Sequence, residues 1–91
     1  MIPLWMYPMA ITAGNTFVLK PSEKVATTSK LLIDLLEESG VPAGVVNMVH
    51  GGHQTVNNII NADPIKAISF VGGNVAGEHI YNNGGANGKR V

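Results

Sequence analysis

A lysine, a proline and a glutamate stand where an apolar run gives way to a helical pattern. The run ends at Lys20, and Pro21, Ser22 and Glu23 follow before the helix begins. A glutamate carboxylate accepts hydrogen bonds from ribose hydroxyls, and a lysine donates to them and sets the local charge. The structural alternative is that Ser22 caps the helix and Glu23 lies near its positive end. Capping leaves the lysine unexplained, so both interpretations stay open.

Two adjacent glycines mark a second candidate site. Gly72 and Gly73 follow an apolar run and precede another helical pattern. Glycines let the backbone approach a phosphate, and a helix N-terminus offers free N–H groups and a positive dipole. The stretch is not a GxGxxG motif, and it lacks the lysine and hydroxyl residue of a P-loop. A tight turn that needs glycine for its backbone shape is the alternative.

The remaining reactive side chains point to no catalytic or metal site. His50 and His53 are separated by two glycines, but a metal centre needs further ligands, so we expect none. His79, beside Ile80 in a helical pattern, is predicted to be packed or half-exposed. The chain has no cysteine and no Ser-His-acid pattern. We therefore name no catalytic residue.

Composition limits the classes of protein that fit. The chain has 91 residues, of which 45% are hydrophobic and 13% charged, with a net charge of zero. It is thus one ordered domain at most, without the basic surface that nucleic acids or anionic membranes require. The apolar N-terminal stretch is shorter than the roughly 20 residues that span a bilayer. It has no basic start of a signal peptide, and we predict a buried helix at 1–13.

The rest of the chain alternates strand and helix patterns. Strands are predicted at 16–20, 45–49 and 67–71, and helices at 26–39, 54–62 and 74–83. Continuous apolar strands imply a parallel sheet covered by helices, an α/β fold with βαβαβα order. Right-handed crossovers bring the strand-to-helix turns to one edge of such a sheet. We expect turns 20–23, 50–53 and 72–77 to converge there.

Three motifs resemble a known family. They read GNTFVLKPSE, GVPAGVVNMVHG and ISFVGGNVAG, and their order and separation resemble the cofactor-binding domain of the aldehyde dehydrogenase superfamily. IPLWMYPMAI and GGANGKRV look most like its CoA-acylating branch, which oxidises methylmalonate and malonate semialdehydes. The resemblance implies that residues 1–91 are part of a Rossmann-like NAD-binding domain. Residues 1–13 would form a buried helix by the substrate passage and 16–91 strand–helix units, with the catalytic domain outside the chain.

The resemblance also implies roles for particular residues. The NAD-binding positions would be Lys20, Ser22 and Glu23 at the adenosine ribose, Gly51 at the adenosine half, Gly72 and Gly73 at the pyrophosphate, and Ala76 at the adenine. Ile2 and Trp5 would line the substrate passage. Gly73 departs from the family pattern, which has serine there, so a hydroxyl contact with the pyrophosphate is lost.

By the same resemblance, the whole enzyme uses a cysteine outside this chain and passes hydride to NAD. It then transfers the acyl group to CoA, which yields propionyl-CoA or acetyl-CoA. Its partners would be a small aldehyde and CoA, with no nucleic acid or membrane, and it would be a mitochondrial homotetramer, although the chain carries no targeting segment. The alternative is a short non-catalytic chain that binds nucleotide or associates with a full-length subunit.

Overall fold

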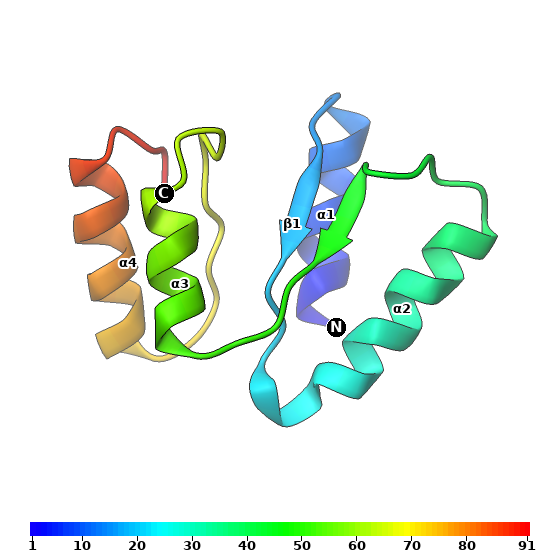
Figure 1. The fold of residues 1–91 in the computed structure, drawn as a ribbon, viewed down its shortest axis with the longest axis horizontal. Helices are drawn as coiled ribbons and strands as arrows, with labels where there is room; N and C mark the ends of the chain where they lie inside the picture. Colours follow the sequence, from blue (N-terminus) through cyan, green and yellow to red (C-terminus); the bar gives the residue numbers. More distant parts are fainter. The chain divides into compact units, whose positions relative to one another are not determined.

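The computed structural model describes residues 1–91 as two compact units, Met1–Gly51 and Gly52–Val91. Unit 1 contains α1 (Ile2–Thr12), β1 (Phe17–Leu19), the short 3-10 helix η1 (Glu23–Val25), α2 (Ala26–Glu38) and β2 (Val46–Met48) (Figure 1). Unit 2 contains α3 (His53–Asn61) and α4 (Asn74–Ala86). None of the helices combines the length and the apolar character that crossing a membrane requires.

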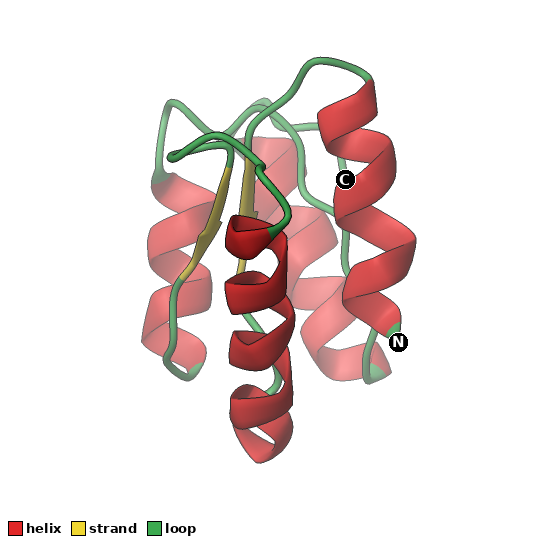
Figure 2. Cartoon of the chain, turned by 90° about the vertical axis from the view of Figure 1, so that its right-hand side faces the viewer, coloured by secondary structure: helices red, strands yellow, loops and turns green.

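Unit 1 is built on a pair of parallel strands. Phe17, Val18 and Leu19 of β1 lie opposite Val46, Asn47 and Met48 of β2, and the two short strands run side by side in Figure 2. Val49 N–H donates to the Leu19 carbonyl at 2.9 Å, which extends the ladder at the carboxyl end. Helix α2 is the crossover that parallel strands need. The predicted α/β class and its first βαβ unit are confirmed.

Helix α1 forms where it was predicted, with a proline in its first turn, where a missing N–H costs nothing. Its buried residue is Tyr7, whose ring meets Phe17 of β1 edge-on with centroids 6.4 Å apart. Trp5 and Met9 are 56% and 76% exposed within this chain, because α1 packs on β1 along one side only. Burial of the remaining faces of α1 by other segments stays a prediction.

Helix α2 ends as its sequence predicts. Gly40 adopts φ 100°, a left-handed conformation that favours glycine. The Gly40 N–H donates to the Glu37 carbonyl at 3.2 Å, and the Val41 N–H donates to the Leu36 carbonyl at 3.4 Å. These two bonds form a Schellman motif, which satisfies the last carbonyls of the helix.

Unit 2 is a pair of helices joined through apolar and polar contacts. Ile60 of α3 and Ile80 of α4 are its most buried apolar residues, 2% and 4% exposed. Lys89 is also buried, at 8% exposed, and its Nζ donates to the carbonyls of Ala62 and Ile65 at 2.6 and 2.5 Å. The ammonium therefore lies at the C-terminus of α3, where unpaired carbonyls and the helix dipole favour a cation.

The third predicted strand, 67–71, is not observed as a strand. Its only ladder contact is an isolated parallel bridge between Ala67 and Arg90, in which the Ile68 N–H donates to the Arg90 carbonyl at 2.8 Å. A strand needs a partner of comparable length. Here a single bridge is formed, so the apolar run does not become a strand.

Helix α4 also runs past its predicted end at Gly84-Gly85. It continues to Ala86, and Gly88, at φ 75°, takes the left-handed position that closes it. The Gly88 N–H donates to the Gly85 carbonyl at 3.0 Å and the Lys89 N–H to the Gly84 carbonyl at 2.9 Å, a second Schellman motif. Gly84 lies inside the helix, and its missing Cβ leaves room for Val91, whose Cγ2 would otherwise lie 2.8 Å away.

Candidate functional site

The turn after β1 holds the lysine and the glutamate that first suggested a ligand. Lys20 is half-buried and donates from Nζ to the Pro21 carbonyl at 3.0 Å. That bond holds the ammonium close to the end of β1 and leaves two of its three donor positions unused. Pro21 itself is buried. The side chain is thus partly ordered by its own backbone and still able to donate to a ligand.

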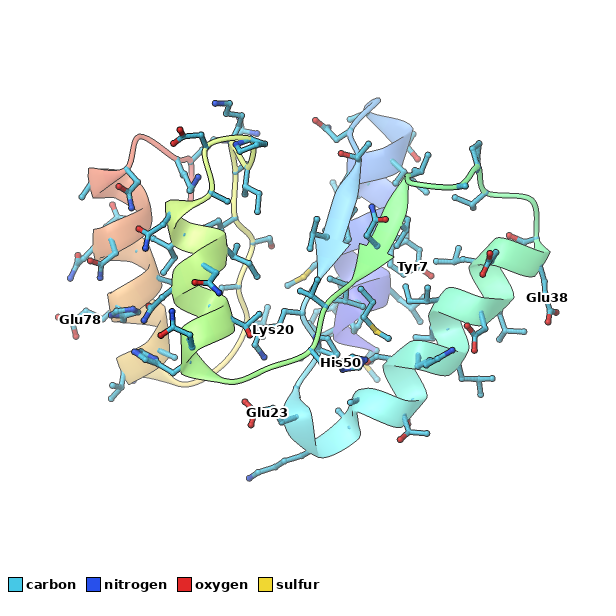
Figure 3. All side chains as sticks on the ribbon, in the orientation of Figure 1. Tyr7, Lys20, Glu23, Glu38, His50 and Glu78 are labelled. Atoms are coloured by element: carbon cyan, nitrogen blue, oxygen red, sulfur yellow. The ribbon has the colours of Figure 1, made fainter.

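Ser22 and Glu23 differ in the contacts that they make within the chain. Ser22 precedes η1, and its Oγ accepts from the Lys24 N–H at 3.4 Å, so the capping interpretation of Ser22 is confirmed. Glu23 is exposed and its carboxylate has no hydrogen bond or ion pair within the chain. In Figure 3, Lys20, Glu23 and His50 lie at the same end of the unit 1 strands. The Glu23 carboxylate is therefore free to accept from a ligand.

Gly51 stands at the same edge, after β2. Its φ of 141° lies in the region that side chains rarely adopt, so the position requires glycine for backbone shape. Because β1 and β2 are parallel, their carboxyl ends share an edge, and the turns that carry Glu23 and Gly51 share it too. The predicted convergence is confirmed for these first two turns. The third turn belongs to unit 2.

The turn before α4 offers backbone rather than side-chain chemistry. Gly73 is the N-cap, in extended conformation at φ −70° and ψ 153°, and no side chain caps the helix. The first helical bond is the Gly77 N–H donating to the Gly73 carbonyl at 3.0 Å. The N–H groups of residues 74–76 therefore precede the ladder and remain available to an acceptor. Ala76 is exposed in this first turn.

An open depression of about 600 Å³ lies over this turn. Its lining is mixed, apolar rings beside glycines, and consists of Phe70, Val71, Gly72, Gly73, Asn74, Gly77, Glu78 and Tyr81. The Phe70 ring forms part of its wall, and a Cβ at position 72 would lie 2.6 Å from Phe70 Cζ. A Cβ at position 73 would meet nothing within 4 Å.

The structural alternative for the glycine pair is therefore wrong in its original form. Neither Gly72 nor Gly73 has a positive φ, so neither is required for backbone shape. Gly72 is required for close approach of the Phe70 ring, and Gly73 has no steric requirement at all. On α1, the two predicted passage residues, Ile2 and Trp5, are both exposed.

The histidines contact amides and each other. The rings of His53 and His79 lie 5.0 Å apart, and His79 Nε2 lies 2.8 Å from Asn57 Oδ1. His79 is half-buried, as predicted. No group of three or more His, Cys, Asp or Glu side chains is gathered in the chain.

Sequence reasoning missed two polar ties in unit 2: the buried Lys89 and the amide partners of His79. The spacing of His79 and Asn83 on one helical face was the available signal for the second. No sequence signal pointed to the buried Lys89, because a buried lysine is rare and its carbonyl acceptors are not visible in a sequence.

Comparisons with known proteins place these features in context. All 91 residues match the aldehyde dehydrogenase family. The chain is 60% identical over its whole length to a probable methylmalonate-semialdehyde/malonate-semialdehyde dehydrogenase (acylating), mitochondrial, from Dictyostelium discoideum, and covers 17% of that protein. It is 57% identical to the methylmalonate-semialdehyde/malonate-semialdehyde dehydrogenase (acylating), mitochondrial, of Rattus norvegicus, again covering 17%.

Two solved structures are similar to this chain in both fold and sequence. A methylmalonate-semialdehyde dehydrogenase from Oceanimonas doudoroffii superposes with a TM-score of 0.97 at 49% identity, over 99% of this chain and 18% of that one. A putative methylmalonate-semialdehyde dehydrogenase from Sinorhizobium meliloti 1021, complexed with NAD, has a TM-score of 0.97 at 42% identity, with the same coverage.

Proposed function

The chain belongs to the aldehyde dehydrogenase family, and we propose that it supplies the adenosine and pyrophosphate part of an NAD site. The enzyme around it would be an NAD-dependent, CoA-acylating dehydrogenase of methylmalonate and malonate semialdehydes. The chain spans 17% of the length of the Dictyostelium relative, so the remaining parts of that activity would lie in other segments. The similarity to the NAD-complexed Sinorhizobium structure is the observation that carries the proposal.

The end of β1 fits an adenosine ribose. Glu23 presents a carboxylate without a partner in the chain, and Lys20 keeps two donor positions unused beside it. A ribose with two adjacent hydroxyls needs this pairing of an acceptor with a donor. Ser22 supports the turn by capping η1. The Glu23 carboxylate would also repel the 2′-phosphate of NADP, which favours NAD. Gly51, at the same edge, would lie against the adenosine half.

The start of α4 fits a pyrophosphate. Its first N–H groups have no side-chain cap, Gly73 and Asn74 help to line an open depression, and the helix dipole favours an anion at this end. Gly72 keeps the Phe70 ring close, Gly73 leaves space for the phosphate, and Ala76 adds a small apolar surface for the adenine. The two halves of the proposed site thus use different donors: side chains after β1 and backbone after Gly73.

NAD, when bound, would accept hydride from the substrate. The chain itself contains no cysteine, so the thiolate that forms the acyl thioester and passes it to CoA would come from another segment. The exposed Ile2 and Trp5 of α1 would line the substrate passage. We extend to the full-length protein the mitochondrial location that the relatives' names give, and propose a homotetramer.

The test uses the full-length protein that contains this chain. We expect Glu23→Gln and Lys20→Met each to weaken NAD binding by roughly tenfold or more, since each removes a charge-assisted hydrogen bond. NAD affinity would be measured by fluorescence titration. Glu38→Gln, an exposed carboxylate at the far end of α2, is the matched control.

A comparison of NAD with NADP binding makes the test of Glu23 more specific. Glu23→Gln should lose affinity for NAD while NADP binding is unchanged or improved, because the repulsion of the 2′-phosphate is gone. If Glu23→Gln and Glu38→Gln bind NAD alike, the proposed ribose site is wrong.

A further inference from the structure

The turn that precedes α4 has no backbone hydrogen bonds of its own. The Ile68 N–H donates to the Arg90 carbonyl at 2.8 Å, and the next such bond along the chain joins the Gly77 N–H to the Gly73 carbonyl at 3.0 Å. No backbone–backbone hydrogen bond involves residues 69–72. The position of this turn relative to the start of α4 therefore depends on side-chain packing.

The ring of Phe70 supplies that packing. A Cβ at position 72 would lie 2.6 Å from Cζ of the ring and 3.2 and 3.3 Å from its two Cε atoms, so the tip of the ring lies against Gly72. A Cβ at position 77 would lie 3.5 Å from Cε1, so an edge of the same ring lies beside Gly77 of α4. One side chain thus packs on both the turn and the start of the helix. The ring is 39% exposed and also lines the open depression.

We propose that Phe70 is a positioning residue, whose ring holds the turn at 72–73 in place beside the start of α4. The N–H groups of residues 74–76 precede the helical ladder. The ring keeps these groups where the coenzyme pyrophosphate needs them, and it acts through the turn and not by a hydrogen bond of its own. This inference rests on the proposed NAD site.

The first variant, in the full-length protein, is Phe70→Leu. Leucine is apolar but ends before the Cε and Cζ atoms that meet the turn. We expect NAD affinity, measured by fluorescence titration, to fall by roughly three- to tenfold, since misplaced N–H groups form weaker bonds to a charged phosphate. Adenosine lacks the pyrophosphate, and its ribose would contact Lys20 and Glu23. Its affinity, measured by calorimetry, should change by less than about twofold.

Gly72→Ala tests the ring contact directly, because its Cβ would lie 2.6 Å from Phe70 Cζ. Overpacking should displace the ring or the turn and lower NAD affinity by roughly tenfold. Added to Phe70→Leu, the same substitution should cost less than about twofold, since the ring atoms that it would meet are absent. Gly77→Ala is the matched control. Its Cβ would lie at an ordinary contact distance of 3.5 Å from the ring, so NAD affinity should stay within about twofold.

Hydrogen exchange without NAD gives a second readout, which does not depend on coenzyme binding. The Gly77 N–H is bonded to the Gly73 carbonyl at the start of the helix. Phe70→Leu should speed exchange of this N–H. Exchange at Ile80, which is 4% exposed in the core of unit 2, should stay slow and show that the helix pair is still folded.

The proposal is overturned if Phe70→Leu binds NAD as tightly as the unsubstituted protein, or if it weakens NAD and adenosine binding equally. An equal cost of Gly72→Ala with and without Phe70→Leu also overturns it, because the added Cβ would then obstruct the coenzyme itself. A failure of the NAD site shows differently: Glu23→Gln would bind NAD normally while Phe70→Leu still speeds exchange at Gly77.

Discussion

The residues proposed to bind NAD come from both units, but they differ in kind between unit 1 and unit 2. In unit 1 the groups proposed to contact the coenzyme are charged side chains, Lys20 and Glu23, at the end of a backbone ladder. In unit 2 they are backbone N–H groups at a helix start where side chains are small or absent. The turn that carries a side chain can fix the orientation of that side chain. The orientation of an uncapped helix N-terminus depends instead on the contacts that position the whole helix. Unit 2 holds its helices with polar ties from Lys89 and His79.

The contrast between the two units predicts that the largest loss of stability follows a substitution of Lys89. In the full-length protein, Lys89→Met should keep the bulk of the side chain but leave the Ile65 carbonyl without a donor and the Ala62 carbonyl with the Ile65 N–H alone. We expect a loss of about 2–4 kcal/mol in the local stability of unit 2, since two hydrogen bonds from a charged donor are lost and one carbonyl is left unpaired. Hydrogen exchange would show reduced protection in α3 and α4 and unchanged protection in β1 and β2.

Lys66→Met is the matched control, because Lys66 is exposed and its side chain has no bonded partner. Equal protection in the two variants would mean that Lys89 is buried without holding the helices, and the contrast between the units would lose its main support.

The second prediction concerns a substitution that would add a side-chain hydrogen bond to the coenzyme in unit 2, the kind of contact proposed for unit 1. Gly73→Ser adds a hydroxyl at an N-cap whose extended conformation suits serine, in a position where a Cβ meets nothing within 4 Å. A hydroxyl-to-phosphate bond is charge-assisted, so NAD affinity in the full-length protein should rise about tenfold. Fluorescence titration measures the change.

Gly73→Ala is the control for this prediction, since it adds the Cβ without the hydroxyl. An equal gain in both variants would assign the effect to backbone stiffening, and no gain in either would remove the pyrophosphate from this turn.

A third prediction tests how closely unit 2 is packed, through two adjacent glycines in α4. Gly84→Ala would place a Cβ 2.8 Å from Val91 Cγ2, whereas at Gly85 nothing lies within 4 Å. Overpacking should make Gly84→Ala destabilising by about 1–3 kcal/mol. Gly85→Ala should instead stabilise the helix by about 0.5–1 kcal/mol, the usual gain over glycine. Local hydrogen exchange in α4 would report the opposite signs, and a shared sign would contradict the packing.

These two units also differ in how far sequence reasoning could reach. The αβ order of unit 1, the end of α2 at Gly40 and the shared edge of Glu23 and Gly51 were all predicted, because each depends on local periodicity and turn chemistry. Unit 2 was predicted less well. The apolar run at 67–71 has strand character, but a strand also needs a partner, and a partner is not a local property.

Side-chain contacts between distant segments explain the remaining misses. The pair Gly84-Gly85 is typical of a helix end, yet the helix continues to Ala86. Val91 packs against Gly84, and Gly88 provides the turn that ends the helix. The burial predicted at 1–13 stays a prediction, since composition does not say which side of α1 meets another element. The resemblance to a family pointed to the candidate NAD residues, which spacing alone left open.

The smallest predicted effect lies at Ser22, where unit 1 uses a side chain for structure instead of binding. Its Oγ accepts from the Lys24 N–H at 3.4 Å, a long hydrogen bond at the start of a short, exposed 3-10 turn. Ser22→Ala should therefore cost only about 0.5 kcal/mol in local stability, the lower end of the range for caps. Hydrogen exchange at η1 and the first turn of α2 would measure it.

The informative quantity in this variant is NAD affinity, with Glu23→Gln as the reference. If Ser22 only caps, Ser22→Ala should change NAD affinity by less than about twofold while Glu23→Gln loses about tenfold. A loss in Ser22→Ala as large as that in Glu23→Gln would mean that the hydroxyl contacts the coenzyme. The turn after β1 would then contribute three side chains to the site, and the contrast with the backbone-only turn before α4 would become sharper.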